Sequence, residues 1–330
     1  MALDLSGDRF RLKTLSSRDV LKALKRDARA GLVHAPRSLP PKYFYDEAGS
    51  RLFSEICQTR DYYLTRTELA LLQRHADEII VTARPQTCVE LGAGASVKTE
   101  VLLSRLDSRS DSVAYVTIDV CEEVLVESAG RLLCTFPGLR IESLAAEYLA
   151  GIEALHGLEK PVLYVFLGSS IGNFTEQEAI ELLGRVAEKM APGDHFLLGL
   201  DRVKDRGVLE RAYDDALGVT ARFNLNVLKV LNARLGANFR LDGFSHLAVY
   251  DDAREQIEMY LVAGCDQEVA LPAINETICL REGERILTEI SRKYSRSSVQ
   301  HLLSKSGLCE QAHYVPDNEY FSLVLAKPAD

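Results

Sequence analysis

The chain has 330 residues, enough for one large or two medium domains with a well-buried core. Its composition, with 47% hydrophobic and 26% charged residues, is typical of a soluble globular protein. No apolar run approaches the roughly 18–20 residues that cross a bilayer, and the N-terminus lacks the apolar core of a signal peptide. The formal charge of −9, without a clustered Lys/Arg stripe, argues against nucleic-acid binding. We therefore expect neither a membrane nor a nucleic acid as a partner.

The cysteines and histidines are spread along the chain. The seven cysteines form no C-x-x-C pair, which is typical of reduced thiols in a cytoplasmic protein. The seven histidines include no H-x-x-x-H pair. We therefore predict a cytoplasmic protein without a metal site.

From about residue 86 to residue 202, short apolar runs alternate with helix-like stretches. The apolar runs predict strands: TCVEL (87–91), SVAYVTIDV (112–120), LRIESLAA (139–146), PVLYVFLGS (161–169) and DHFLLGLD (194–201). The intervening segments, such as 98–106 and 176–190, repeat apolar residues at spacings of three and four, and Thr175 with Glu178 predicts a capping box. This alternation predicts βαβ units and a doubly wound, Rossmann-like α/β sheet with both faces covered.

The pattern changes after Asp201. A long helix is predicted over 214–236, followed by hairpins over 246–264 and 276–291. A helix at 297–307 then leads to a final antiparallel pair at 308–316 and 320–327. These elements predict an inserted α+β domain. We assign residues 66–202 and 293–330 to the doubly wound domain, and residues 1–65 and 203–292 to the second, substrate-binding domain.

The segment VELGAGASVKTEVLL (89–103) places a glycine turn between the first strand and its helix. A dinucleotide fingerprint requires a third glycine where this chain has Val97, and the P-loop motif is absent. Glu90, just before the glycines, would repel a pyrophosphate but can pair with an ammonium group. Asp119 ends the next predicted strand, where a carboxylate can accept hydrogen bonds from ribose hydroxyls.

Both acidic residues fit an amino-acid-bearing nucleoside without phosphates, a description that matches S-adenosylmethionine. The turn, E-x-G-x-G followed by an acidic end of the second strand, resembles class I methyltransferases. Two other interpretations remain open: a glycine turn that only reverses the chain, and a nicotinamide-linked dehydrogenase.

Longer motifs resemble the histidine Nα-methyltransferases of ergothioneine biosynthesis over nearly the whole chain. They are KYFYDEAGSRLFSEICQTRDYYLTRTE (42–68), FLGSSIGNFT (166–175), AYDDALGVTARFNLNVLKVLN (212–232), IEM (257–259) and LTEIS (287–291). The resemblance implies an S-adenosylmethionine-dependent domain with an inserted substrate domain. It also implies conversion of L-histidine to its trimethylammonium betaine, hercynine, in three successive transfers. We expect a monomer that acts on a small amino-acid substrate.

The resemblance also implies which residues hold the cofactor. They are Glu90, Gly92, Gly94, Lys98, Asp119, Glu147 and Tyr148. Two departures from the family pattern occur. Glu147-Tyr148 replaces an Asp-Phe pair beside the adenine, and GAGASVKT replaces the commoner G-S-G-T-S-x-K-T.

For the substrate, the resemblance implies two groups of residues. Tyr62, Asn173 and Tyr213 would hold the α-amino and carboxylate end, while Glu289 and Ser291 would face the imidazole. Three further residues complete the predicted pocket: Met259 near the imidazole, Tyr45 beside the reacting nitrogen, and Gly168 in a wall that tolerates added methyl groups. Tyr45 and Asn173 are the predicted catalytic residues.

Each substrate residue also has a purely structural interpretation. Tyr62 suits a core aromatic, Asn173 can bond its own turn, Met259 can fill an apolar face, and Glu289 can be a solvated strand residue. The charged run at 251–256 is interpreted as a hairpin turn only.

Three further functions are compatible with the sequence. A relative could methylate another amine, such as tryptophan, which would require no imidazole acceptor, yet Met259 and Glu289 are both present. The second is a nicotinamide dehydrogenase, and the third is a non-catalytic binding module. No histidine falls within the motifs, so we do not expect a histidine general base.

Overall fold

The structure, a computed structural model, describes residues 9–15, 17–108 and 113–329, which form two compact units. The first unit contains residues 9–15, 64–203 and 293–329, and the second contains residues 17–63 and 204–292. The chain passes from one unit to the other at residues 63/64, 203/204 and 292/293, and the cofactor-binding and substrate-binding roles of the two units stay predictions. The assignment of the N-terminal segment to the second domain is wrong for strand β1 (Phe10–Thr14), because β1 pairs in parallel with strand β5 of the first unit.

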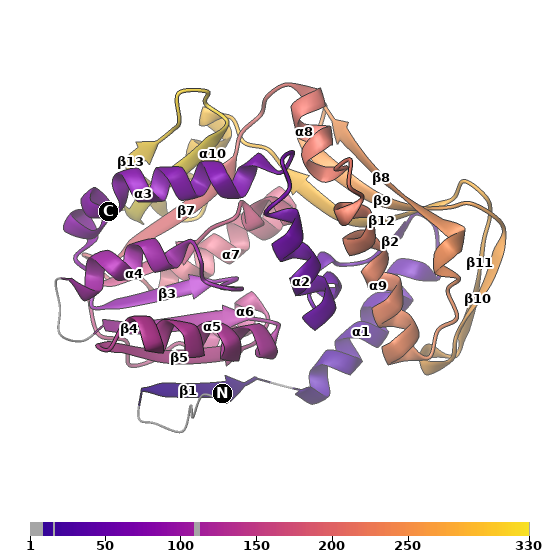
Figure 1. The fold of residues 1–330 in the computed structure, drawn as a ribbon, viewed down its shortest axis with the longest axis horizontal. Helices are drawn as coiled ribbons and strands as arrows, with labels where there is room; N and C mark the ends of the chain where they lie inside the picture. Colours follow the sequence, from indigo (N-terminus) through magenta and orange to yellow (C-terminus); the bar gives the residue numbers. More distant parts are fainter. Residues whose placement is uncertain (1–8, 16, 109–112, 330) are drawn as a thin grey trace. The chain divides into compact units, whose positions relative to one another are not determined.

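The described part of the first unit contains an eight-stranded sheet with the order β1-β5-β4-β3-β6-β7-β14-β13 (Figure 1). Its other strands are β3 (Thr87–Leu91), β4 (Val113–Asp119), β5 (Leu139–Ala145), β6 (Val162–Phe166), β7 (His195–Asp201), β13 (Leu308–Tyr314) and β14 (Phe321–Pro328). The strands from β1 to β7 in this sheet run parallel, and β14 and β13 are antiparallel additions. The five predicted parallel strands and the final antiparallel pair are confirmed, whereas β1 was not predicted.

Helices cover both faces of this sheet, so the fold is doubly wound. They are α3 (Tyr63–Ala83), α4 (Thr99–Asp107), α5 (Glu122–Thr135), α6 (Tyr148–Ala154), α7 (Glu176–Lys189) and α10 (Arg296–Lys305). Val89 and Leu91 of β3 pack in one core with residues of α6, α7 and α10. Because side chains alternate along a strand, Glu90 points to the opposite face. The predicted capping box of α7 is confirmed, since Thr175 and Glu178 bond each other's backbone N–H groups.

Strand order places the ligand-binding edge of the first unit. Strand β3 pairs with β4 on one side and with β6 on the other, so the order reverses at β3. In sheets of this kind, ligands bind at the carboxyl ends of the strands beside the reversal. The turns that follow β3, β4 and β6 are therefore the place to search for a site.

The second unit contains a four-stranded sheet with the order β2-β12-β9-β8 and a separate two-stranded sheet. The strands are β2 (Arg37–Ser38), β8 (Phe244–Asp251), β9 (Gln256–Ala263), β10 (Gln267–Leu271), β11 (Glu276–Leu280) and β12 (Arg285–Arg292). The predicted hairpin of β8 and β9 is confirmed, and the charged run 251–256 forms its turn. The second predicted hairpin is wrong. Strand β11 pairs with β10, where Val269 lies opposite the buried Ile278, and β12 pairs with β9.

Helices complete the second unit. They are α1 (Ser17–Leu32), α2 (Glu47–Ile56), α8 (Arg206–Tyr213) and α9 (Val219–Leu235), with short 3₁₀ turns η1 (Pro41–Phe44), η3 (Leu241–Gly243) and η4 (Pro272–Ile274). Helix α9 begins at Val219, not at the predicted Asp214. The reason is that the Asp215 carboxylate accepts the N–H groups of Val219 and Thr220 at 3.0 and 2.7 Å and so ends the preceding turn. Over the described residues, no helix is both long and apolar enough to cross a membrane.

Candidate functional site

The glycine turn after β3 exposes its backbone. Gly92 and Gly94 adopt φ angles of +68° and +46°, which favour glycine. A Cβ atom at Gly92 would lie 2.8 Å from the Tyr148 hydroxyl oxygen, whereas one at Gly94 would meet no described atom within 4 Å. The turn therefore lets a ligand approach the backbone closely, and the predicted proximity of Tyr148 to this turn is observed.

Asp119, at the end of β4, ties the glycine turn to the neighbouring strand. Its Oδ2 accepts the Gly94 N–H at 2.9 Å, and its Oδ1 accepts the Cys121 N–H at 3.0 Å. Burial raises the pKa of Asp119, and these backbone hydrogen bonds oppose that rise. Each carboxylate oxygen can accept more than one hydrogen bond. Asp119 therefore keeps acceptor capacity for hydroxyl groups of a ligand.

Glu90 lies beneath the turn, and only 3% of the residue is exposed. One of its oxygens accepts the hydroxyl of Thr99, the first residue of α4, and the other accepts the hydroxyl of Tyr115. Tyr115 also reaches Ser96 Oγ at 3.0 Å, at a residue with a positive φ. Burial raises the pKa of Glu90 to about 7. What the structure shows is a buried support for the turn, and the pairing of Glu90 with an ammonium group stays a prediction.

Glu147 and Tyr148 occupy the start of α6, where Glu147 is the exposed N-cap residue. The Tyr148 ring packs edge-on against Phe166 of β6 with ring centroids 5.2 Å apart. Burial raises the pKa of the Tyr148 hydroxyl, so it is a neutral hydrogen-bonding group at ordinary pH. Tyr148 thus borders the glycine turn, and the contact of Glu147 and Tyr148 with an adenine stays a prediction.

The turn after β6 carries the two other predicted site residues of the first unit. Gly168 has a φ of +79°, and Asn173 ends the 3₁₀ turn η2 (Ser170–Asn173). Asn173 is half-buried, and none of the described residues hydrogen-bonds its side-chain amide. Among the described residues, no hydrogen bond therefore supports the interpretation that the Asn173 side chain closes its own turn.

Glu68 of α3 is a residue of this edge that the sequence analysis missed. It is fully buried, it accepts the Gly168 N–H with both oxygens at 2.9 Å, and it pairs with Lys98 Nζ at 2.6 Å. A signal was present in the sequence. Glu68 falls on the same stripe of α3 as the buried residues Leu64, Leu71 and Leu72.

In the second unit, the structure brings together the predicted tyrosines and strand residues. The Tyr213 hydroxyl lies 2.7 Å from Ser291 Oγ, and the rings of Tyr62 and Tyr213 are 6.1 Å apart. Tyr62 is buried, and this burial, followed by the proximity of Tyr213, raises the pKa of its hydroxyl well above the usual value. Tyr45 packs edge-on against Phe53 and Phe223 of the same unit. We call Tyr45, Tyr62 and Tyr213 the tyrosine cluster.

Met259 of β9 and Glu289 of β12 are directly opposite one another in the sheet. Glu289 is only 8% exposed, so the interpretation as a solvated strand residue is wrong. Met259 is fully buried, which suits both a filler of the apolar face and a pocket wall. Glu289 and Ser291 are two residues apart on β12 and so lie on the same face of the sheet. Because Ser291 contacts the Tyr213 hydroxyl, Glu289 lies near the tyrosine cluster.

His246 of β8 supports the cluster from behind. Its Nε2 lies 2.8 Å from the Tyr213 carbonyl oxygen, and its Nδ1 lies 2.8 Å from the Asn224 side-chain nitrogen. Burial lowers the pKa of His246. A neutral imidazole with Nε2–H donating and Nδ1 accepting satisfies both bonds. Both ring nitrogens of His246 are thus occupied.

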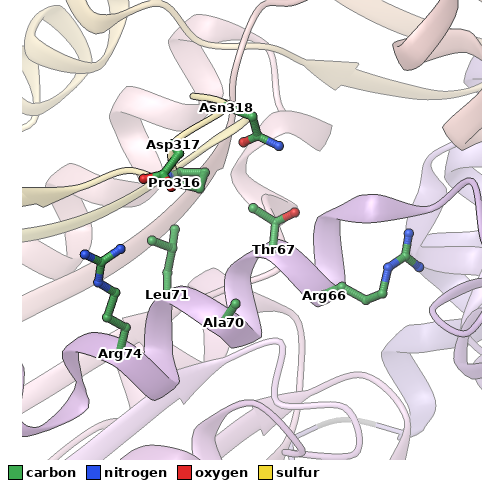
Figure 2. A pocket seen from close by; sticks show the side chains of 8 residues that line it. All are labelled: Arg66, Thr67, Ala70, Leu71, Arg74, Pro316, Asp317 and Asn318. Carbon is green, nitrogen blue, oxygen red and sulfur yellow. The ribbon is translucent and has the colours of Figure 1, made fainter.

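A separate hollow lies on the first unit between α3 and the segment before β14. It has a volume of about 360 Å³. Figure 2 shows its lining side chains: Arg66, Thr67, Ala70, Leu71, Arg74, Pro316, Asp317 and Asn318. It contains none of the predicted site residues.

The doubly wound sheet, its glycine turn and the acidic end of its second strand define the class I, S-adenosylmethionine-binding type of methyltransferase. The chain belongs to the family of histidine-specific, SAM-dependent methyltransferases, which matches residues 24–328.

Curated relatives cover nearly the same length. The chain is 42% identical over 303 residues to a histidine N-alpha-methyltransferase of Mycolicibacterium smegmatis, covering 92% of this chain and 94% of the relative. It is 41% identical over 305 residues to one of Mycobacterium tuberculosis, with the same two coverages. It is also 30% identical to ergothioneine biosynthesis protein 1 of Neurospora crassa, covering 88% of this chain and 33% of that longer protein.

Proposed function

We propose that this chain transfers methyl groups from S-adenosylmethionine to the α-amino group of L-histidine, giving the trimethyl betaine that opens ergothioneine biosynthesis. The family and the named relatives support this function. The structural observation that carries it is Glu289, a buried carboxylate opposite Met259 and near the tyrosine cluster. A carboxylate oxygen can accept more than one hydrogen bond, and an imidazole N–H is a suitable donor to it.

The first unit would hold the cofactor, which supplies an electrophilic methyl group on a sulfonium. Gly94 leaves its backbone open to it, Tyr148 lies against Gly92, and Asp119 would offer acceptors to the ribose hydroxyls. Lys98 suits the carboxylate of its amino-acid end, because an ammonium is the natural partner of that group. Glu147 and Tyr148 would border the adenine.

The substrate would be held by its two ends. Tyr62, with its raised pKa, stays a neutral phenol and, with Asn173 and Tyr213, would bond the α-amino and carboxylate groups without adding a full charge. Glu289 would accept the imidazole N–H in a charge-assisted hydrogen bond, and Ser291 would lie beside it. Met259 and Gly168 would shape the walls.

Methyl transfer requires that the amine nitrogen, the methyl carbon and the sulfur lie on one line and that the amine is unprotonated. Intramolecular reactions show that correct placement corresponds to effective molarities of roughly 10⁵ M or more. The ammonium must lose a proton before each transfer. Both His246 nitrogens are engaged. From the family resemblance we propose that Tyr45 lies beside the reacting nitrogen and guides that proton to water.

One assay tests this function against its rivals. The purified protein is incubated with S-adenosylmethionine and each free amino acid in turn, and mass spectrometry follows the products. We expect mono-, di- and trimethylhistidine in sequence. Methylation of tryptophan in preference to histidine would favour the related amine methyltransferase. If no methylated product forms, calorimetric titration separates the remaining rivals: binding of S-adenosylmethionine would favour a binding module, and binding of NAD alone would favour a dehydrogenase.

We further propose that the protein acts as a monomer in the cytoplasm and binds no nucleic acid. The cysteines of the described residues are all free thiols, and the net charge is −9. Light scattering after size exclusion should give a mass near 36.6 kDa. A dimer mass would contradict the monomer.

A further inference from the structure

Glu68 joins two turns of the carboxyl edge through one buried carboxylate. The Gly168 N–H, in the turn after β6, lies 2.9 Å from both Glu68 oxygens. Lys98, at the end of the glycine turn after β3, donates to Glu68 Oε2 at 2.6 Å. The two turns come from different βαβ units, and Glu68 comes from the helix that precedes both. All three residues belong to the first unit.

The surroundings of Glu68 fix its carboxylate in position. A Cβ atom at Gly199 of β7 would lie 1.9 Å from Glu68 Oε1, so the strand has no side chain where the carboxylate lies. The side chain of Glu68 is 0% exposed, against 22% for that of Lys98. Lys98 Nζ would also lie 3.2 Å from a Cβ at Gly168, so the ammonium reaches the second turn itself.

Packing alone does not account for a carboxylate here. Leu64, Leu71 and Leu72 fill the same stripe of α3, and an apolar residue in place of Glu68 would continue it. Burying an ion pair costs solvation, and replacing such pairs by well-packed apolar residues is often neutral or stabilising. We therefore explain the carboxylate by its hydrogen bonds to the Lys98 ammonium and to the Gly168 backbone N–H.

We propose that Glu68 is a positioning residue that holds Lys98 in place to receive the carboxylate at the amino-acid end of the cofactor. An ammonium has three N–H donors. One bonds Glu68, which leaves others for an anion on the more exposed side. The same carboxylate bonds the Gly168 N–H, so one residue positions both Lys98 and the turn after β6. The proposal rests on the proposed function, because that function supplies the ligand.

Glu68→Gln tests the charge while keeping the shape. The three bonds to Glu68 come from donors, and Gly168 uses both oxygens. A glutamine amide has one acceptor oxygen and one NH₂ donor. With the amide oxygen at the Oε2 position, both donors keep an acceptor, whereas the flipped amide places its NH₂ toward Lys98. In both orientations the variant removes the negative charge that pairs with the Lys98 ammonium, so the lysine is held less firmly.

The readout is calorimetric binding of two ligands that differ only at the amino-acid end. S-adenosylhomocysteine carries the carboxylate, and 5′-methylthioadenosine lacks it. We expect Glu68→Gln to weaken S-adenosylhomocysteine about 10-fold or more, the range for a charge-assisted hydrogen bond, and to change 5′-methylthioadenosine less than about twofold. Lys98→Met should show the same selectivity, and the double variant should lose little beyond either single variant.

Asp194→Asn is the matched control. Asp194 is also buried, accepts the N–H groups of Val162 and Ala191 at 2.7 and 2.8 Å, and pairs with Lys160. It precedes β7, at the opposite edge of the same sheet. We expect this control to lower the melting temperature in a calorimetric scan while leaving the affinities of both ligands unchanged.

The outcomes separate a positioning role for Glu68 from a purely structural one. Loss confined to S-adenosylhomocysteine supports positioning. Equal loss of both ligands shows that Glu68 only stabilises the fold and overturns the proposal, as does unchanged affinity for S-adenosylhomocysteine. If Glu68→Gln does not fold, Glu68→Asp replaces it, with an expected selective loss of a few-fold. Because binding is measured without amino-acid substrate, failure of histidine methylation would leave this result standing and refute only the substrate assignment.

Discussion

The carboxyl edge of the first unit and the tyrosine cluster of the second unit hold polar groups by different means. At the edge, carboxylates accept backbone N–H groups: the half-buried Asp119 bonds Gly94 and Cys121, and the buried Glu68 bonds Gly168. In the cluster, side chains on regular elements bond one another, as Tyr213 does with Ser291. The edge is thus built from loop backbone, whereas the cluster is built from side chains, with Tyr213 on α8, Ser291 on β12, and Tyr45 and Tyr62 on connecting segments.

This difference has a consequence for mutation. A change at the edge moves a turn, so it should alter binding of every ligand that uses the turn, and often stability as well. A change in the cluster removes one contact from a rigid frame, so it should alter one substrate more than another. The following predictions test this contrast, from the largest expected effect to the smallest.

The largest effect concerns stability and Glu90. Its folded pKa of about 7 lies above the usual 4.5, because burial disfavours the charged form. The stability contribution is therefore fully present below about pH 4.5 and is lost as the pH rises through 7. One pKa unit corresponds to 1.36 kcal/mol, so ionisation costs roughly 3 kcal/mol at pH 8.5.

Glu90→Gln should remove this pH dependence. Urea unfolding should show the variant gaining stability relative to the natural protein between pH 5 and pH 8.5, by up to roughly 3 kcal/mol. The control, Glu188→Gln, removes an exposed pair with Arg185 and should show no such trend. A stability difference that is independent of pH would mean that Glu90 is ionised at both values.

Asp119→Ala should give the largest loss of cofactor affinity. It removes an acceptor for the ribose and also frees the Gly94 and Cys121 N–H groups. We expect a loss of about 10-fold or more, because hydrogen bonds to a charged group contribute roughly 1.5–3 kcal/mol. Calorimetry should show S-adenosylhomocysteine and 5′-methylthioadenosine weakened alike, since both carry the ribose. Unchanged affinity would remove Asp119 from the site.

Glu289→Ala should discriminate between substrates. We expect kcat/KM for histidine to fall about 10- to 150-fold, the range for a charge-assisted hydrogen bond, with little loss for tryptophan. Asn173→Ala should lower turnover of every amino acid alike, because it would act on their shared backbone end. Equal losses for histidine and tryptophan in Glu289→Ala would make the carboxylate structural and remove the main physical support for histidine.

Sequence patterns carried much of the fold. Apolar runs that alternate with amphipathic segments predicted the doubly wound sheet. The observed strand order, and the helices on both faces of the sheet, match that prediction. The errors arose where local pattern and tertiary pairing diverge. The turn at Glu282–Gly283 suggested that β11 and β12 form a hairpin. In the structure, β12 instead pairs with the longer strand β9. Strand β1 has an exposed, polar edge pattern, so its pairing with β5 is visible only in three dimensions.

The site was predictable to the extent that motifs carry it. The glycine turn and Asp119 lie together as expected, and so do Tyr62, Tyr213, Glu289 and Ser291 of the second unit. Glu68 was missed, because a single acid within an apolar helix stripe gives no spacing motif. The role of Glu68 depends on its contacts with Gly168 and Gly199. Both are distant from it in the sequence and come close to it only in the folded structure.

The smallest predicted effect separates the two partners of the bond between Tyr213 and Ser291. If Tyr213 also holds the substrate, Tyr213→Phe should raise the KM for histidine about fivefold, since a neutral hydrogen bond contributes roughly 0.5–1.5 kcal/mol. Ser291→Ala removes the same 2.7 Å bond but leaves the phenol in place. Ser291→Ala should therefore lower the free energy of unfolding about as much as Tyr213→Phe does, while it raises the KM for histidine less. Steady-state kinetics and thermal unfolding of both variants measure the two effects. Equal changes in KM would mean that the phenol serves only Ser291, and the cluster would then hold its substrate through Tyr62.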